Sequence, residues 1–474
     1  MKTKTRALLA LTLAFCFWKV STLPPGSVHH AMEQQVSAEE VQRVAPGQMA
    51  RQQGLQLVET LARWEGNPSP VGREALVAVA RDRGETLREV LRMEGPETLL
   101  ALALPAEVLA RFPAEARTHL ERHVEGRGFF GVYCSSPVPG SNGGGYGYEV
   151  QLNGEVFRAH PTGAWRDLQT RHDIFISGVA IDDELVVAGS PEEDGNLDGV
   201  QGGETADLAP NRTGPNRVLY YIAQFADETS DPITASTAVS RMTVTSEFYR
   251  NNSKNQVYFI ADKGTTEGGS LMDIVFIKLP KVGTDYSNMG ALLADARSEA
   301  SKQGFDYSKY NLDIIVTRPA SNFNYAGQAY IGSQGAHLLS NYTSLRTAGH
   351  EIGHNMGLGH AYYWRTDATS PYGRDSRPGG YVSDFDNHEG IEYGHYFSIM
   401  SGQSGGEIDD ATKPHFSPME KVQMGVYSLG QEVEEVSSSG TYRVFRHDTR
   451  TLTGMPRGIR VVPPATHYMG VTTM

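Results

Sequence analysis

The segment at residues 350–360 constrains this chain more than any other, because it gathers three of the fifteen histidines of the sequence. It reads HEIGHNMGLGH. If residues 343–356 form a helix, His350 and His354 lie one turn apart on the same face. Glu351 lies about 100° round the helix from His350, so its carboxylate stands beside this pair of imidazoles.

A glycine follows the predicted helix and lets the third histidine return to the other two. Gly357 falls where a left-handed residue would end the helix, and glycine adopts that conformation without strain. The chain then reverses and brings His360 back to the pair. Three neutral imidazoles with an open fourth position are typical of a catalytic zinc site. The alternative is a helix whose histidines are merely packed, and it leaves the glutamate and the glycine unexplained.

Each residue of this pattern has a chemical role. Zinc is redox-inert, so such a centre favours hydrolysis, in which the ion activates water and polarises a carbonyl. The sequence predicts that His350, His354 and His360 bind zinc. Glu351 is the predicted general base, which takes the proton of the water and passes it to the leaving amine. The long HExxHxxGxxH pattern is far more specific than HExxH alone.

The pattern resembles the metzincin metallopeptidases, in particular the gametolysin-type branch and its secreted bacterial relatives. Four further segments share the resemblance: VTSEFYRNNSKNQVYF, AGQAYIG, EYGHYFSIMSG and FSPMEKVQMG. The resemblance covers roughly residues 216–430. It implies an α+β fold in which residues 217–430 form the catalytic domain, with a twisted mixed sheet, an active-site helix and a methionine turn. It also implies an endopeptidase that acts on protein or glycoprotein substrates.

By the same resemblance, Met400 would be the structural methionine beneath the zinc, not a ligand. The alternative is an ordinary core methionine, since methionine fills irregular gaps well. Some metzincins carry a tyrosine two residues after this methionine. Gly402 stands there in this chain, so no tyrosine ligand is assigned.

The N-terminus has the polarity of an export signal. Three basic residues within the first six precede an apolar stretch at residues 7–18, which is too short to span a bilayer. We therefore predict a signal peptide over residues 1–25, removed near its end, and a secreted or periplasmic protein without stable membrane insertion. The alternative is a buried N-terminal helix.

The region between the signal and the catalytic domain has two parts. Residues 26–125 place apolar side chains three and four positions apart, which predicts a helical pro-region. Residues 126–190 alternate apolar and polar side chains, and turn residues at 153–154 and 182–183 separate them, which predicts a small β pro-domain.

A linker rich in Gly, Asp, Asn and Pro follows at residues 191–216, and cleavage there would activate the enzyme. Asp194, Asn196 and Asp198 match the opening of a calcium loop, but Thr205 replaces the glutamate expected at the twelfth position. The alternative to a Ca²⁺ site is a solvated turn, because turns favour the same residues.

The tail at residues 431–474 contains two strand-like runs, TYRVF and GIRVV. It resembles the β domain that follows the catalytic domain in bacterial relatives. It is either a minimal module or the beginning of a longer one.

The sequence has two cysteines, and Cys16 would leave with the signal peptide. The remaining Cys134 has no partner for an internal disulfide. Its thiolate would suit the fourth position of the zinc and keep a precursor latent, as cysteines do in some metzincin precursors. The surrounding GVYCSSPVPG departs from the known switch motif, so the alternative is an idle thiol.

The net charge of −13 argues against a nucleic-acid ligand, which would need a basic face. Two rival functions remain. One is a zinc amidase acting on cell-wall peptide, and the other is a catalytically inactive zinc-binding or adhesion module. The presence of Glu351 argues against the second, because a structural site needs no base. The sequence sets neither the oligomeric state nor the peptide bond preferred.

Overall fold

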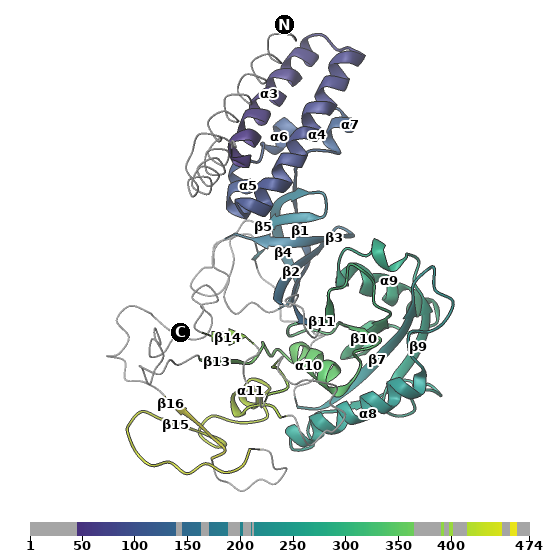
Figure 1. Cartoon of the computed structure of the whole chain (residues 1–474), viewed down its shortest axis with the longest axis vertical. Helices are drawn as coiled ribbons and strands as arrows, with labels where there is room; N and C mark the ends of the chain where they lie inside the picture. Colours follow the sequence, from purple (N-terminus) through teal and green to yellow (C-terminus); the bar gives the residue numbers. More distant parts are fainter. Residues whose placement is uncertain are drawn as a thin grey trace, which may run out of the picture. The chain divides into compact units, whose positions relative to one another are not determined.

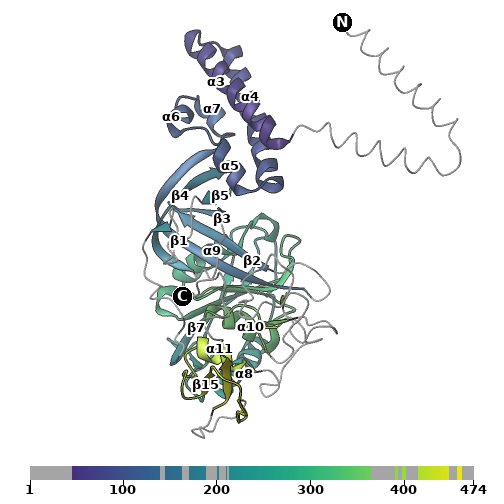
Figure 2. The ribbon, with the colours of Figure 1, turned by 90° about the vertical axis from the view of Figure 1, so that its left-hand side faces the viewer.

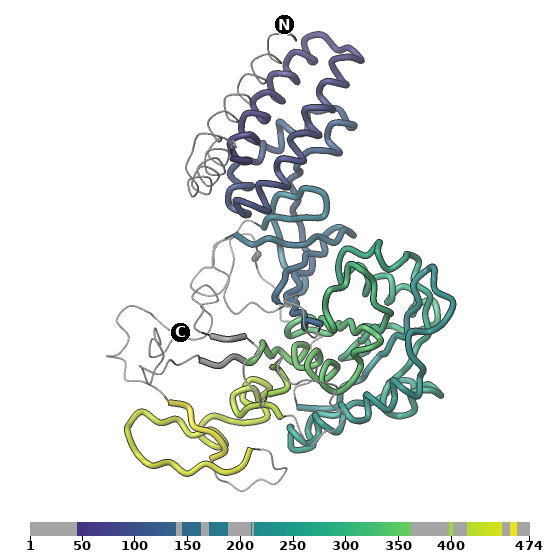
Figure 3. Tube along the Cα trace, in the orientation of Figure 1, coloured from purple at the N-terminus to yellow at the C-terminus, as the bar shows by residue number. Residues whose placement is uncertain are grey.

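The computed structural model describes residues 45–138, 145–162, 170–187, 200–201, 210, 213–364, 390–392, 398–401, 415–447 and 456–461. The chain divides into two compact units, one ending at Glu121 and one beginning at Arg122 (Figures 1 and 3). The predicted signal peptide, Cys16, Gly402 and the three residues of the calcium alternative lie outside the described residues. Among the residues described, no helix is long and apolar enough to cross a membrane.

The first unit is helical, in line with its apolar spacing. Its helices are α3 (Pro46–Gly66), α4 (Pro70–Met93), α5 (Pro96–Leu102), α6 (Ala106–Leu109) and α7 (Ala114–Arg117). Helices α3 and α4 lie side by side (Figure 1), and leucines of both helices form the core with Leu109, Phe112 and Leu120. Prolines stand in the first turn of the three longer helices, where the missing N–H costs no hydrogen bond.

The second unit begins with a small barrel. Its strands are β1 (Arg122–Pro137), β2 (Gly145–Leu152), β3 (Glu155–Pro161), β4 (Arg171–Ile181) and β5 (Glu184–Val187). The pairings run β1–β2–β3–β5–β4 and back to β1, so the ring closes; β6 (Val200–Gln201) pairs antiparallel with β4. Asn153 and Asp182 take the left-handed backbone expected at the predicted turns, with φ of 54° and 52°.

A mixed sheet follows in the chain. Its strands are β7 (Pro215–Gln224), β8 (Tyr258–Ile260), β9 (Asp273–Lys278), β10 (Leu312–Thr317), β11 (Tyr325–Tyr330) and β12 (Ala336–Leu339). The order is β11–β12–β10–β7, and β8 and β9 both pair with β7. These pairings are parallel, except that β11 runs antiparallel to β12. The mixed α+β class predicted from the sequence is present.

Helices cover both faces of this sheet (Figure 2). Helices α8 (Ala235–Asn252) and α10 (Leu345–Asn355) pack on the face that carries Val218, Tyr220 and Ile222. Helix α9 (Met289–Lys302) packs on the opposite face, against the alternate residues of β7. A strand buried on both faces reads as a continuous apolar run, which is why RVLYYIAQF predicts a strand.

The C-terminal part differs from the prediction in one strand. Its elements are β13 (Tyr362–Trp364), β14 (Gly390–Glu392), α11 (Pro418–Gln423), β15 (Val433–Val436) and β16 (Gly458–Val461), with two 3-10 turns earlier in the chain, η1 (Gly283–Asp285) and η2 (Tyr307–Lys309). Residues 458–461 of the run GIRVV form β16, but TYRVF forms no strand. Its Tyr442 hydroxyl donates locally to Ser438 O at 2.7 Å, and β15 pairs with β16 instead.

Strand β1 joins the barrel to the mixed sheet. Its first residues pair with β4 and its middle residues with β2. Its last residues, Tyr133–Pro137, pair antiparallel with β11, the edge strand of the mixed sheet. The strands predicted as a separate β domain are therefore continuous with the mixed sheet in one sheet of twelve strands.

Candidate metal centre

Helix α10 carries the first two histidines and ends as its glycine predicts. Gly357 has φ of 90°. Its N–H donates to His354 O at 2.8 Å, and the N–H of Leu358 donates to Gly353 O at 3.0 Å. These two bonds form a Schellman motif, which reverses the chain at the end of a helix. The reversal directs the following residues back toward the helix.

The structure brings the three histidines together. His350 Nε2 and His354 Nε2 lie 3.0 Å apart. The ring of His360 lies 5.2 Å from that of His350 and 4.9 Å from that of His354, between centroids. All three side chains are buried.

The hydrogen bonds of the first two imidazoles fix which nitrogens carry protons. Nδ1 of His350 lies 2.8 Å from Ile399 O, and Nδ1 of His354 lies 2.7 Å from Leu358 O. A carbonyl only accepts, so each Nδ1 donates, and each neutral ring turns a lone pair on Nε2 toward the other. Two lone pairs 3.0 Å apart form no hydrogen bond, whereas a cation between them satisfies both. The residues therefore fit a metal ion.

Burial keeps the rings of His354 and His360 neutral. It lowers the pKa of both groups well below the ordinary value, and a proton on His350 would lower it further. A neutral imidazole is the form that binds a metal.

Cys134 of β1 adds a thiol to this cluster. Its Sγ lies 3.1 Å from His360 Nε2, and its side chain is fully buried. The donor atoms of Cys134, His354 and His360 all lie within 4.8 Å of one another. Imidazole and thiolate ligands both suit zinc. The structure thus brings the sequence-predicted thiol to two of the predicted ligands, His354 and His360.

Glu351 lies beside this cluster in a buried site. Its Oε1 accepts a hydrogen bond of 2.6 Å from Ser136 Oγ, and its Oε2 has no hydrogen-bond partner among the described residues. Burial raises the pKa of Glu351 to about 8, although the hydrogen bond from Ser136 opposes the rise. Gly327 of β11 makes room for this carboxylate, because a Cβ there would stand 2.7 Å from Oε1.

Met400 lies against α10 in a short turn. A Cβ on Gly353 would stand 2.4 Å from its sulfur, so the sulfur touches the helix between the two histidines. The Met400 carbonyl accepts from the N–H of Ala361 at 2.9 Å, next to His360. This turn also provides the Ile399 carbonyl that orients His350.

Two residues that the sequence did not single out contact the site. One is Ser136, and the other is Tyr146 of β2, whose hydroxyl accepts from the N–H of His360 at 3.2 Å. Both lie more than 200 positions before their partners, and no local pattern marks them.

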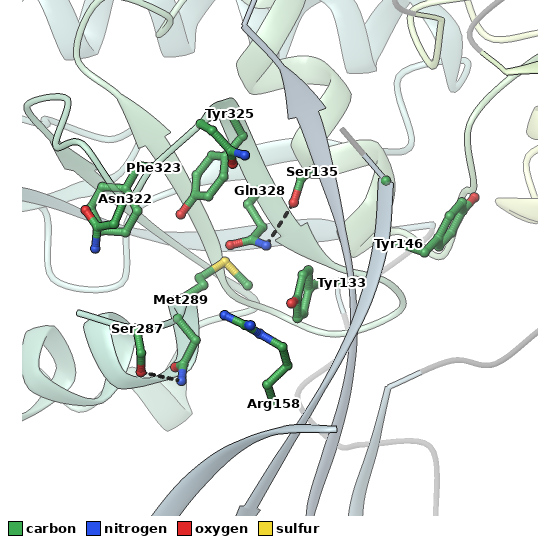
Figure 4. A pocket seen from close by; sticks show the side chains of 13 residues that line it. Tyr133, Ser135, Tyr146, Arg158, Ser287, Met289, Asn322, Phe323, Tyr325 and Gln328 are labelled. Atoms are coloured by element: carbon green, nitrogen blue, oxygen red, sulfur yellow. Dashed lines mark hydrogen bonds between the residues drawn. The ribbon is translucent and has the colours of Figure 1, made fainter. Parts of the chain in front are cut away.

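A polar cavity of about 320 Å³ lies beside β1 (Figure 4). Tyr133 and Ser135, which alternate with Cys134 along the strand, contribute to its lining together with Arg158, Asn288 and Gln328. Gln328 Nε2 donates to Ser135 Oγ at 2.9 Å. Alternate residues of a strand point to opposite faces, so the cavity and the histidine cluster lie on different sides of β1.

Comparison with known proteins adds little to this geometry. No protein-family model and no curated protein sequence matches the chain. Among solved structures, metalloproteinase-II from Bacteroides fragilis is similar at 11% identity and a TM-score of 0.25, over 59% of this chain and 75% of that one. A TM-score this low carries no argument, so the function rests on the residues of this chain.

Proposed function

We propose that this chain is a zinc-dependent endopeptidase. The observation that carries the proposal is the pair of buried imidazole lone pairs that meet at 3.0 Å, with His360 beside them and Glu351 adjacent. In this proposal, His350, His354 and His360 bind the zinc. Zinc is redox-inert and suits these donors, which favours hydrolysis over electron transfer.

The residues divide the reaction among themselves. Zinc, when bound, supplies a Lewis acid that activates water and polarises the scissile carbonyl. Glu351 takes the proton of the attacking water and returns it to the leaving amine. The carbonyls of Ile399 and Leu358 hold the imidazoles in one tautomer. Met400 packs against helix α10 and takes no part in the chemistry.

The same proposal makes the described chain a latent precursor. Strand β1 lies along the edge strand of the sheet and places Cys134 at the histidines. A thiolate there would fill the fourth position of the zinc. Activation then requires that β1 leave the metal centre, which cleavage within residues 191–216 would permit. Export through the N-terminal signal belongs to the proposal, and Ca²⁺ at Asp194 is not needed for it.

The test compares the purified chain with a Glu351→Gln variant on casein, after limited proteolysis has removed residues 1–215. We expect one equivalent of zinc in both proteins. The variant should lose at least about a hundredfold in rate, the usual contribution of a general base. A chelator should abolish wild-type cleavage, and zinc should restore it.

Three results would contradict the proposal. Cleavage by metal-free protein would remove the zinc mechanism. Equal inactivity of the wild type and the variant, with zinc bound, would favour an inactive binding module. Cleavage of cell-wall peptide but not of casein would favour the amidase.

A further inference from the structure

Strand β1 contacts the metal centre at Ser136 as well as at Cys134. We propose that Ser136 is a second lock, which holds the general base Glu351 independently of Cys134. This inference rests on the proposed function, because it assigns Glu351 the role of base. It concerns the regulation of that same site.

The alternation of the strand delivers both residues to one face. Cys134 and Ser136 are two positions apart, so their side chains point the same way, at a spacing of about 7 Å. Ser135 points to the opposite face, where it accepts from Gln328. Cys134 meets His360, and Ser136 meets Glu351. One extended segment therefore reaches both the ligand cluster and the base.

The pairing with β11 fixes this register. Cys134 stands opposite Ala329, and Ser136 stands opposite Gly327. Gly327 is also the residue whose missing side chain leaves room for the Glu351 carboxylate. A donor delivered at this point must be short, and a serine hydroxyl is short enough to reach Oε1 at 2.6 Å.

The contact has a direct chemical consequence. The short hydrogen bond from Ser136 occupies a lone pair of the carboxyl oxygen Oε1. While Ser136 donates to Oε1, the lone pair that accepts this hydrogen bond does not receive the proton of a water molecule. The other oxygen, Oε2, is buried. Removal of the thiol alone therefore leaves the base occupied, and β1 stays in place.

The test uses the full, uncleaved chain, loaded with zinc, in three variants. They are Cys134→Ala, Cys134→Ala with Ser136→Ala, and Cys134→Ala with Ser135→Ala. Ser135 is the matched control, since it is a serine of the same strand with its own side-chain hydrogen bond on the opposite face. The substrate is a short peptide with a fluorophore and a quencher.

We expect the Cys134/Ser136 double variant to cleave the peptide about fivefold to tenfold faster than Cys134→Ala, the effect of losing one hydrogen bond. The Cys134/Ser135 variant should stay within about twofold of Cys134→Ala. Equal rates in the two double variants would overturn the proposal. Full activity of Cys134→Ala alone would overturn it as well.

Hydrogen exchange provides a readout that needs no catalysis. The backbone amides of β11 should exchange faster in the Cys134/Ser136 variant than in the Cys134/Ser135 variant, because β1 is held less firmly. Thermal unfolding checks that each variant is folded. Suppose that exchange rises as expected, but neither the uncleaved variants nor the chain without residues 1–215 cleaves the peptide. The lock then stands and the proposed function fails. If Cys134→Ala cleaves peptide but exchange does not distinguish the serines, the lock fails and the function stands.

Discussion

His337 on β12 shows what burial does to a single titratable residue away from the metal centre. Its ring nitrogens lie 2.8 Å from the hydroxyls of Thr317 and Tyr325, and the side chain is fully buried. Burial lowers its pKa to about 3. An unfolded histidine has a pKa of about 6.5. Between these values the unfolded chain binds a proton that the folded chain does not, so stability falls as the pH falls.

A His337→Gln variant removes the group that binds a proton in the unfolded chain, but it keeps a side chain that forms hydrogen bonds. Between pH 6 and pH 4.5, the unfolding free energy of the wild type should fall more steeply than that of the variant, by about 1 kcal/mol per pH unit. Urea unfolding with chelator present measures both slopes. At pH 7.5 and above, the difference between the two proteins should be constant. Parallel curves over the acidic range would contradict the expected titration of His337.

At the scale of one element, the end of α10 decides whether the third histidine returns. Gly357 has φ of 90°, where a Cβ costs about 1–2 kcal/mol. Gly357→Ala should move His360 and weaken zinc binding about tenfold. The zinc affinity of Gly357→Asn should stay within about threefold of the wild-type value, because asparagine tolerates the left-handed conformation. Competition with a chromophoric chelator measures both. A Gly357→Ala variant with the zinc affinity of the wild type would show that the chain reversal does not position His360.

Elements that depend on neighbouring residues could be predicted from the sequence. The helix around His350, its glycine stop and the turn at Asn153 all follow from local patterns. The contact of Ser136 with Glu351 could not, because it depends on the pairing of β1 with β11. Alternation shows which residues of a strand share a face but not which strand it joins. The run at 441–445 alternates like a strand and still has no sheet partner.

At the scale of the whole chain, each of the two units has a core of its own. In the helical unit, the buried Arg83 side chain donates to the buried Glu121 carboxylate at 2.5 Å and to the carbonyls of Ala50 and Leu102. The donor cluster around His354 belongs entirely to the unit that begins at Arg122. A ligand stabilises the part of the chain that binds it. Zinc should therefore act on one unit only.

Calorimetry of the full chain should show two transitions that respond to different changes. Zinc should raise the transition of the 122–474 unit and leave the helical one unchanged. Arg83→Met leaves the Glu121 carboxylate buried without its partner, which costs about 3–5 kcal/mol. That variant should lower only the helical transition and keep the wild-type affinity for zinc. One transition that shifts with both changes would mean that the two cores unfold together, and the helical unit would then contribute to the stability of the metal centre.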